Sequence, residues 1–238
     1  MQGNRLVFDA VILAGGRSSR LGGVPKQSLV FQGETLLERA VAAADGARRT
    51  VIVGDGETLA GVARTKGPLT GETGPPTLLT CREEPPFAGP AAAIAAGLAA
   101  LSGMGEGAPY CLVLACDMPL AARAVAVLKD ALEQPTGPAG GAGVMACAED
   151  GRMQPLAGFY STHELRKSCQ DLASRNALVN GSVRSLLASL DVQLVTVPAG
   201  STSDVDTWDD AAALGIAAGS QRVGQDRRTG GANVGGTS

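Results

Sequence analysis

One early segment of the chain reads Val11-Ile12-Leu13-Ala14-Gly15-Gly16-Arg17-Ser18-Ser19-Arg20-Leu21-Gly22-Gly23-Val24-Pro25-Lys26. Its apolar beginning predicts a buried strand, and its Gly-, Ser- and Arg-rich continuation predicts a loop that ends at a lysine. Glycines let a backbone approach a ligand closely, successive N–H groups can hold phosphate oxygens, and the cations offset phosphate charge. We therefore interpret the segment as a nucleotide-phosphate loop; the alternative is an ordinary strand-to-helix connection with exposed charges.

The segments around this loop alternate between strands and helices. Asp9–Ala14 and Thr50–Gly54 are continuous apolar runs, typical of parallel strands covered on both faces. Between them, Thr35-Leu36-Leu37-Glu38 fits a capping box that opens a helix, so the order β-α-β predicts a parallel sheet. Further strands are expected at 77–81, 110–115, 143–148, 156–160 and 192–197, and further helices near 57–64 and at 90–101, 119–133, 162–173, 182–190 and 207–217.

The composition favours an α/β protein packed with small side chains. Hydrophobic residues make up 45% of the 238 residues and aromatic residues only 3%, while a net charge of −3 gives no general affinity for nucleic acid. No apolar run suits a membrane span, no signal-peptide pattern opens the chain, and the five cysteines include no C-x-x-C pair, so a cytoplasmic protein with reduced thiols is expected. The polar composition of 219–238 predicts a disordered tail after a single domain of residues 1–218.

The glycine-rich loop does not fit the two common nucleotide-binding motifs. It contains no Gly-Lys-Ser/Thr step, which excludes the P-loop, and its first two glycines are adjacent, which excludes G-x-G-x-x-G. Arg20 and Lys26 therefore supply positive charge to a different kind of phosphate loop.

Asp117 is a candidate metal ligand. It follows the apolar run 110–115 and is therefore expected at the carboxyl end of a parallel strand, where open α/β sheets bind their ligands. A carboxylate in that place suits Mg²⁺; the alternative is that Asp117 caps the helix expected from Pro119.

A second acidic cluster lies near the end of the chain. Asp204 and Asp206 point to the same side of an extended segment, and Asp209 and Asp210 are expected to complement the dipole of the helix that follows. The single histidine, His163, has no accompanying Ser or Cys nucleophile pattern, so no hydrolytic triad is expected.

Taken together and in order, these motifs resemble the molybdenum cofactor guanylyltransferase (MobA-like) family. The resemblance extends over roughly residues 9–217. Its motifs are Leu13-Ala14-Gly15-Gly16, Ser19-Arg20-Leu21-Gly22, Lys26, Gly89-Pro90-Ala91-Ala92-Ala93-Ile94, Cys116-Asp117-Met118-Pro119 and Asp204-Val205-Asp206-Thr207. It implies a Rossmann-like three-layer α/β/α fold with a mostly parallel sheet, of the nucleotide-diphospho-sugar transferase type. It also implies transfer of GMP from GTP to molybdopterin with release of pyrophosphate, and it implies Mg²⁺ as the cofactor.

The resemblance also implies a role for each matching residue. The nucleotide would be bound by residues of the loop, of the segment at Gly89 and of the strand end: Leu13, Ala14, Gly15, Gly16, Arg20, Lys26, Gly89 and Asp117. Arg20, Lys26 and Asp117 would act in catalysis, and Asp117 and Asp206 would hold the metal. The acceptor side would include Gln154-Pro155-Leu156 and Ser182-Val183-Arg184.

Three positions bear on which nucleotide is used. Gly15 resembles guanine-using members, because pyrimidine-using relatives more often carry alanine there. Pro25-Lys26 instead resembles several sugar-phosphate and cytidylyl relatives, and Asp204-Val205-Asp206 resembles cytidylyl-type members. A cytidylyl- or sugar-phosphate nucleotidyltransferase and a non-catalytic nucleotide-binding protein therefore remain the alternatives.

Overall fold

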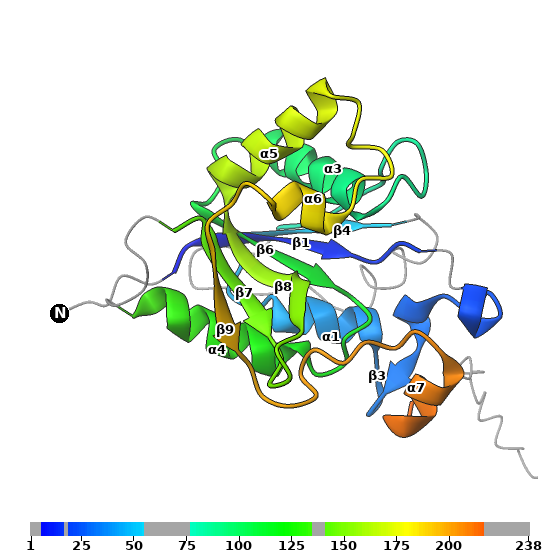
Figure 1. Cartoon of the computed structure of the whole chain (residues 1–238). Helices are drawn as coiled ribbons and strands as arrows, with labels where there is room; N and C mark the ends of the chain where they lie inside the picture. Colours follow the sequence, from blue (N-terminus) through cyan, green and yellow to red (C-terminus); the bar gives the residue numbers. More distant parts are fainter. Residues whose placement is uncertain (1–5, 17–18, 55–76, 135–140, 217–238) are drawn as a thin grey trace, which may run out of the picture.

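A seven-stranded sheet runs through the middle of the molecule in the order β5-β4-β1-β6-β8-β7-β9 (Figure 1). The computed structural model describes residues 6–16, 19–54, 77–134 and 141–216. Neighbouring strands are parallel except that β8 runs antiparallel to both β6 and β7, so the expected mostly parallel sheet is confirmed. The strands are β1 (Phe8–Leu13), β4 (Arg49–Val53), β5 (Thr77–Cys81), β6 (Tyr110–Ala115), β7 (Gly143–Cys147), β8 (Met153–Ser161) and β9 (Val192–Thr196).

Helices cover both faces of this sheet. Helices α1 (Leu36–Ala43) and α4 (Ala121–Glu133) pack on one face, and α3 (Pro90–Ser102), α5 (Thr162–Ser174) and α6 (Val183–Leu187) pack on the other (Figure 1). Each face buries its own cluster of apolar side chains against the helices. The three-layer α/β/α fold predicted from the sequence is therefore confirmed.

Helix α3 lies unusually close to the sheet because one of its residues has no side chain. A Cβ at Gly97 would stand 2.6 Å from Cγ1 of Val11 on β1. The alanine-rich composition of α3 therefore serves close packing on β1 and β4, in addition to its good helix propensity.

Local signals predicted the helix starts better than the ends of the elements. Thr35 and Glu38 form the expected capping box of α1. Strand β8 starts earlier than predicted, since Met153 and Gln154 pair with β7 beyond a bulge. The helix predicted for 207–217 is shorter, because Gly215 adopts a left-handed φ of 70° and ends α7 (Trp208–Ala213).

The order of the strands creates a crevice at the carboxyl ends of β1 and β6. From β1 the chain moves outward to β4 and β5, then returns to place β6 on the other side of β1. The segments that follow β1 and β6 therefore diverge from two adjacent strand ends. Ligands bind at such a switch point in open α/β sheets.

A small third cluster fixes the C-terminal segment beside the glycine-rich loop. It comprises apolar side chains from the loop, the hairpin of β2 (Val30–Phe31) and β3 (Glu34–Thr35), the start of α1, and the region of α7: Leu21, Leu29, Phe31, Leu36, Val205, Ala211 and Ile216. Leu21 and Val205 are almost completely buried in it. Packing in this cluster brings together segments that lie at opposite ends of the sequence.

No helix among the described residues combines the length and apolar character needed to cross a membrane. The helix expected near 57–64 and the tail expected at 219–238 lie outside the described residues.

Candidate active site

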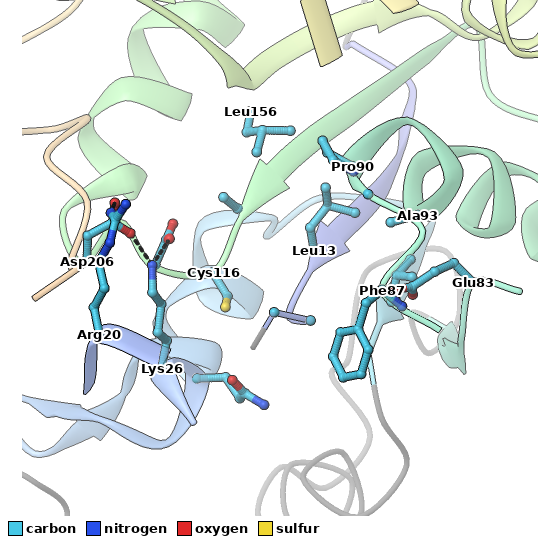
Figure 2. A pocket seen from close by; sticks show the side chains of 17 residues that line it. Leu13, Arg20, Lys26, Glu83, Phe87, Pro90, Ala93, Cys116, Leu156 and Asp206 are labelled. Atoms are coloured by element: carbon cyan, nitrogen blue, oxygen red, sulfur yellow. Dashed lines mark hydrogen bonds and ion pairs between the residues drawn. The ribbon is translucent and has the colours of Figure 1, made fainter. Parts of the chain in front are cut away.

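The main cavity of the described residues opens at the crevice between β1 and β6 and has a volume of about 500 Å³. Figure 2 shows Arg20, Lys26 and Asp206 on one side of it and Glu83 and Phe87 on the other. Its lining comprises Leu13, Gly15, Gly16, Arg20, Lys26, Gln27, Val53, Glu83, Phe87, Gly89, Pro90, Ala93, Ala115, Cys116, Asp117, Leu156 and Asp206.

The charged side of the cavity is built around the ammonium group of Lys26. Its Nζ donates to Asp117 Oδ2 at 3.1 Å and also to Asp206 Oδ1. Nη1 of Arg20 lies 3.4 Å from the other oxygen of Asp206. Two cations and two carboxylates from three separate parts of the chain are thus joined in one cluster at the strand ends.

Backbone contacts fix the two carboxylates in this arrangement. The N–H of Val205 donates to the carbonyl of Asp117 at 3.0 Å, which ties the segment before α7 to the end of β6. The side chain of Asp210 accepts from the backbone N–H of Asp206 and from Thr207, so the capping box of α7 also holds Asp206. Asp210 therefore has the structural role expected from the helix dipole.

Burial and charge act in opposite directions on this cluster. Burial raises the pKa of Asp117, and the charge of Lys26 opposes that rise. Burial acts to lower the pKa of Lys26, but the hydrogen bonds and charges of Asp206 and Asp117 outweigh it, so this pKa is raised. Each partner thus makes the charged form of the other more favourable.

Asp117 is not a helix cap. Helix α4 begins after Leu120, and no side chain caps its first turn. The side chain of Asp117 is 22% exposed and turns to Lys26 instead. The alternative in which Asp117 serves only to start α4 is therefore wrong.

The other side of the cavity has a polar group that sequence reasoning missed. Glu83 is only 8% exposed, and its Oε1 accepts from the backbone N–H of Phe87 at 3.0 Å. Gln27, a second buried polar residue, lines the cavity directly after Lys26 in sequence. The position of Glu83 just after β5, at the carboxyl end of a parallel strand, is the signal that could have identified it.

The structure brings together all but one of the residues that the sequence assigned to the nucleotide. Leu13, Gly15, Gly16 and Gly89 line the cavity with the charged residues. Ala14 does not: it is buried in the core, and its N–H donates to the carbonyl of Val53. The lining of the cavity therefore does not include Ala14, because strand pairing with β4 extends one residue beyond β1.

Two other expectations concern the histidine and the acceptor side. His163 is exposed at the start of α5 and lies 3.8 Å from Glu164, which agrees with a solvated histidine. On the acceptor side, Leu156 lines the cavity, whereas Gln154 donates to the carbonyl of Thr202, and Ser182 caps α6.

The carboxylates of Asp117 and Asp206 fit a magnesium ion whose remaining ligands are phosphate oxygens and water. Among the described residues, no group of three or more His, Cys, Asp or Glu side chains is placed to hold a metal by itself. Mg²⁺ commonly takes one or two protein carboxylates and fills its remaining positions with water and substrate phosphates. The two carboxylates that meet at Lys26 Nζ match that requirement.

Comparison with known proteins gives a consistent result. The family model described as "MobA-like NTP transferase domain" matches residues 10–194. A molybdenum cofactor guanylyltransferase of Acidiphilium cryptum is 38% identical over 100 residues, which is 33% of this chain and about half (51%) of the relative's length.

Two solved structures share the fold. The molybdopterin-guanine dinucleotide biosynthesis protein A of Archaeoglobus fulgidus has a TM-score of 0.58 and 19% identity, covering 87% of this chain and 96% of that one. The 4-diphosphocytidyl-2C-methyl-D-erythritol synthase of Anaerococcus prevotii has a TM-score of 0.63 and 11% identity, covering 89% and 96%. At these identities the likeness concerns the fold alone.

Proposed function

Because the chain belongs to the family of MobA-like NTP transferase domains and is a nucleotidyltransferase, we propose that it transfers GMP from GTP to molybdopterin. The relative in Acidiphilium cryptum, named as a molybdenum cofactor guanylyltransferase, supports this assignment. The structural observation that supports it most is that the cavity has two different sides (Figure 2). One side holds the charged cluster around Lys26, and the other holds the buried carboxylate of Glu83.

The buried carboxylate favours guanine as the base. An ionised carboxylate only accepts hydrogen bonds, and Glu83 keeps one oxygen on the N–H of Phe87. Guanine presents two adjacent donors, N1–H and N2–H, to such a group, whereas the corresponding edge of cytosine presents one donor beside two acceptors. Glu83 would therefore bind guanine and leave cytosine poorly matched.

The charged side of the cavity suits the triphosphate. Arg20 and Lys26 would bind its phosphates, and Lys26 would stabilise charge at the α-phosphate. In the transfer, an oxygen of the acceptor phosphate bonds to the α-phosphorus, and the bond from that phosphorus to the oxygen bridging to the β-phosphate breaks. Both partners are anions, so positioned cations lower the barrier by reducing repulsion and stabilising the leaving pyrophosphate.

Asp117 and Asp206 would hold Mg²⁺, which when bound would supply further neutralisation of the phosphates. The reaction requires no protein nucleophile, which agrees with the solvated position of His163. The acceptor would enter on the side of Leu156, the one acceptor-side residue of the sequence analysis that lines the cavity.

Pyrophosphate release with each NTP and molybdopterin tests the assignment. We expect GTP to be the preferred donor and Glu83→Gln to lose the preference for GTP over CTP, because the amide replaces one acceptor by a donor. Glu84→Gln, a change at the neighbouring exposed carboxylate, is the matched control. Preference of the unaltered protein for CTP would instead favour the cytidylyltransferase alternative, which is the named activity of one structural neighbour.

Asp117→Ala distinguishes an enzyme from a nucleotide-binding protein of the same fold. Turnover should be abolished, while the fold remains, because Asp117 is fixed by its backbone and contributes no helix cap. Unchanged product formation would contradict the role of Asp117.

A further inference from the structure

The ammonium group of Lys26 stands at the point where the two proposed metal ligands meet. Asp117 reaches this point from the end of β6. Asp206 reaches it from the segment before α7 (Figure 2). Asp117 Oδ2 lies 3.1 Å from Nζ, and Asp206 Oδ1 also contacts it. One ammonium therefore already contacts an oxygen of each carboxylate that a metal ion would require.

The ion pairs of this cluster join equal numbers of cations and carboxylates, and Asp204 adds a further negative charge that acts on Asp117. Two cations, Arg20 and Lys26, face two carboxylates, Asp117 and Asp206. A divalent ion approaching alone would meet carboxylates whose charge is already offset, and it would have to displace an ammonium that is only 22% exposed. Two cations at one point repel each other strongly in such a partly buried site.

A triphosphate changes this balance because it offers the two cations new partners. Lys26 has a long flexible stem, and its backbone is held next to Leu29, which is buried in the third apolar cluster. The ammonium can therefore move to a phosphate while the loop stays in place. Asp117 and Asp206 are then left without their counter-ion at the moment the nucleotide arrives.

We propose that Lys26 acts as a stand-in cation which makes metal binding depend on the nucleotide. Without a nucleoside triphosphate, Lys26 holds the two carboxylates and excludes a divalent ion. With the triphosphate, Lys26 moves to the phosphates and the carboxylates accept the metal. This inference rests on the proposed function only in that the ligand is a metal–nucleoside triphosphate pair.

Manganese binding, followed by the EPR signal of free Mn²⁺, tests this proposal without a measurement of activity. We expect the unaltered protein to bind Mn²⁺ with the α,β-methylene analogue of GTP and to bind it far more weakly without a nucleotide. Lys26→Met should bind Mn²⁺ without a nucleotide about 10-fold to 100-fold more tightly than the unaltered protein. Lys26→Met combined with Asp117→Asn should lose that gain, because one of the two carboxylates is neutralised.

Lys167→Met is the matched control, since it removes the same charge from the exposed side of α5. Equal Mn²⁺ affinity of Lys26→Met and the unaltered protein would overturn the proposal. Tight nucleotide-independent binding by the unaltered protein would also overturn it, and that measurement needs no variant.

The same experiment separates the stand-in role from the proposed function. If the CTP analogue recruits Mn²⁺ and the GTP analogue does not, the guanine assignment fails and the stand-in role is supported. If Lys26→Met gains Mn²⁺ affinity but neither analogue recruits the ion, the exclusion by Lys26 is supported and the nucleotidyltransferase site is not. If GMP is transferred but Lys26→Met gains nothing, the proposed function stands and the stand-in role is overturned.

Discussion

Two ion-pair clusters lie at opposite edges of the central parallel strands and differ in how many hydrogen-bond partners each charged group has. At the amino ends of β1 and β4, Arg49 binds both oxygens of Asp9, at 3.1 Å and 2.6 Å. The same guanidinium donates to the carbonyls of Leu101 and Glu106, and Asp9 also accepts from the N–H of Ala108. At the carboxyl ends, a single ammonium is shared between Asp117 and Asp206 at the wall of a cavity.

Burial and the number of partners distinguish a structural ion pair from a ligand site. The Arg49–Asp9 pair has one partner of each sign, is almost completely buried, and joins the loop after α3 to the sheet. It has no capacity left for a ligand. In the Lys26 cluster one ammonium is shared between two carboxylates at the wall of the cavity, so a ligand can take over these partners.

The largest expected effect comes from breaking the structural pair. Arg49→Met should lower the free energy of unfolding by about 3–5 kcal/mol, because it leaves the carboxylate of Asp9 buried without a counter-ion. Activity per folded molecule should not change, since Arg49 lies at the far end of the sheet from the cavity. Urea denaturation measures the loss, and Arg48→Met at the exposed neighbouring position is the control. A loss no larger than that of the control would contradict the structural role.

Removing the ammonium of Lys26 should have the opposite effects, a large loss of activity and a small change in stability. Lys26→Met should lower kcat/KM by about 10²–10³-fold, because it removes a cation that binds the triphosphate and stabilises charge during transfer. Its free energy of unfolding should change by no more than about 1 kcal/mol, since the carboxylates it leaves are partly exposed to water. Steady-state kinetics and urea denaturation of the same preparation check both statements. A large loss of stability with full activity would show that the two clusters had been assigned the wrong way round.

Local patterns in the sequence predicted those structural features that depend only on neighbouring residues. The apolar run before Asp117 placed it correctly at the end of a strand, and the Thr35–Glu38 capping box was read from four residues. The partner of Lys26 could not be read locally, because Asp206 lies 180 positions away and is brought near by the packing of Val205 against Leu21. A periodic pattern identifies the buried face of an element but does not say which other element covers it.

The residues that the sequence analysis missed have a similar explanation. Asp9 stands at the beginning of an apolar run and Arg49 just before another, where charges usually mark a solvent-exposed strand end. Their pairing follows from the register of β1 against β4. Glu83 is one of two adjacent glutamates, and only the folding of the segment before α3 over the cavity makes it different from the exposed Glu84.

A smaller effect on stability is expected at the start of α7, where Asp210 both caps the helix and holds the proposed metal ligand Asp206. Hydrogen bonds from the side chain and backbone of Thr207 lower the pKa of Asp210 below its usual value. A lowered pKa means that the ionised carboxylate stabilises the fold above the pKa of the unfolded chain, and that this contribution is lost as the pH falls through the pKa of the folded state. Asp210→Asn should therefore lower Tm at about pH 6, and the difference from the unaltered protein should shrink at about pH 3.

Asp209→Asn is the control for this prediction, because Asp209 lies in the same first turn but is exposed and takes no part in the capping box. Thermal unfolding at the two pH values measures the effect. A Tm difference that is the same at both would mean that the charge of Asp210 does not support the cap.

The smallest effect on stability is expected at Arg20, together with an effect on the KM for the nucleotide that depends on salt. Its side chain is 71% exposed and reaches only one oxygen of Asp206, at 3.4 Å. Arg20→Gln should therefore change the free energy of unfolding by less than about 0.5 kcal/mol. Its KM for the nucleotide should rise clearly at low ionic strength and much less at high ionic strength, because an exposed charge acting on phosphates is screened by salt. Arg48→Gln removes another exposed charge, at the amino ends of the strands, and should leave KM unchanged at both salt concentrations. If KM rises equally for both variants, the effect is one of net charge, and Arg20 belongs with the solvated surface and not with the cavity.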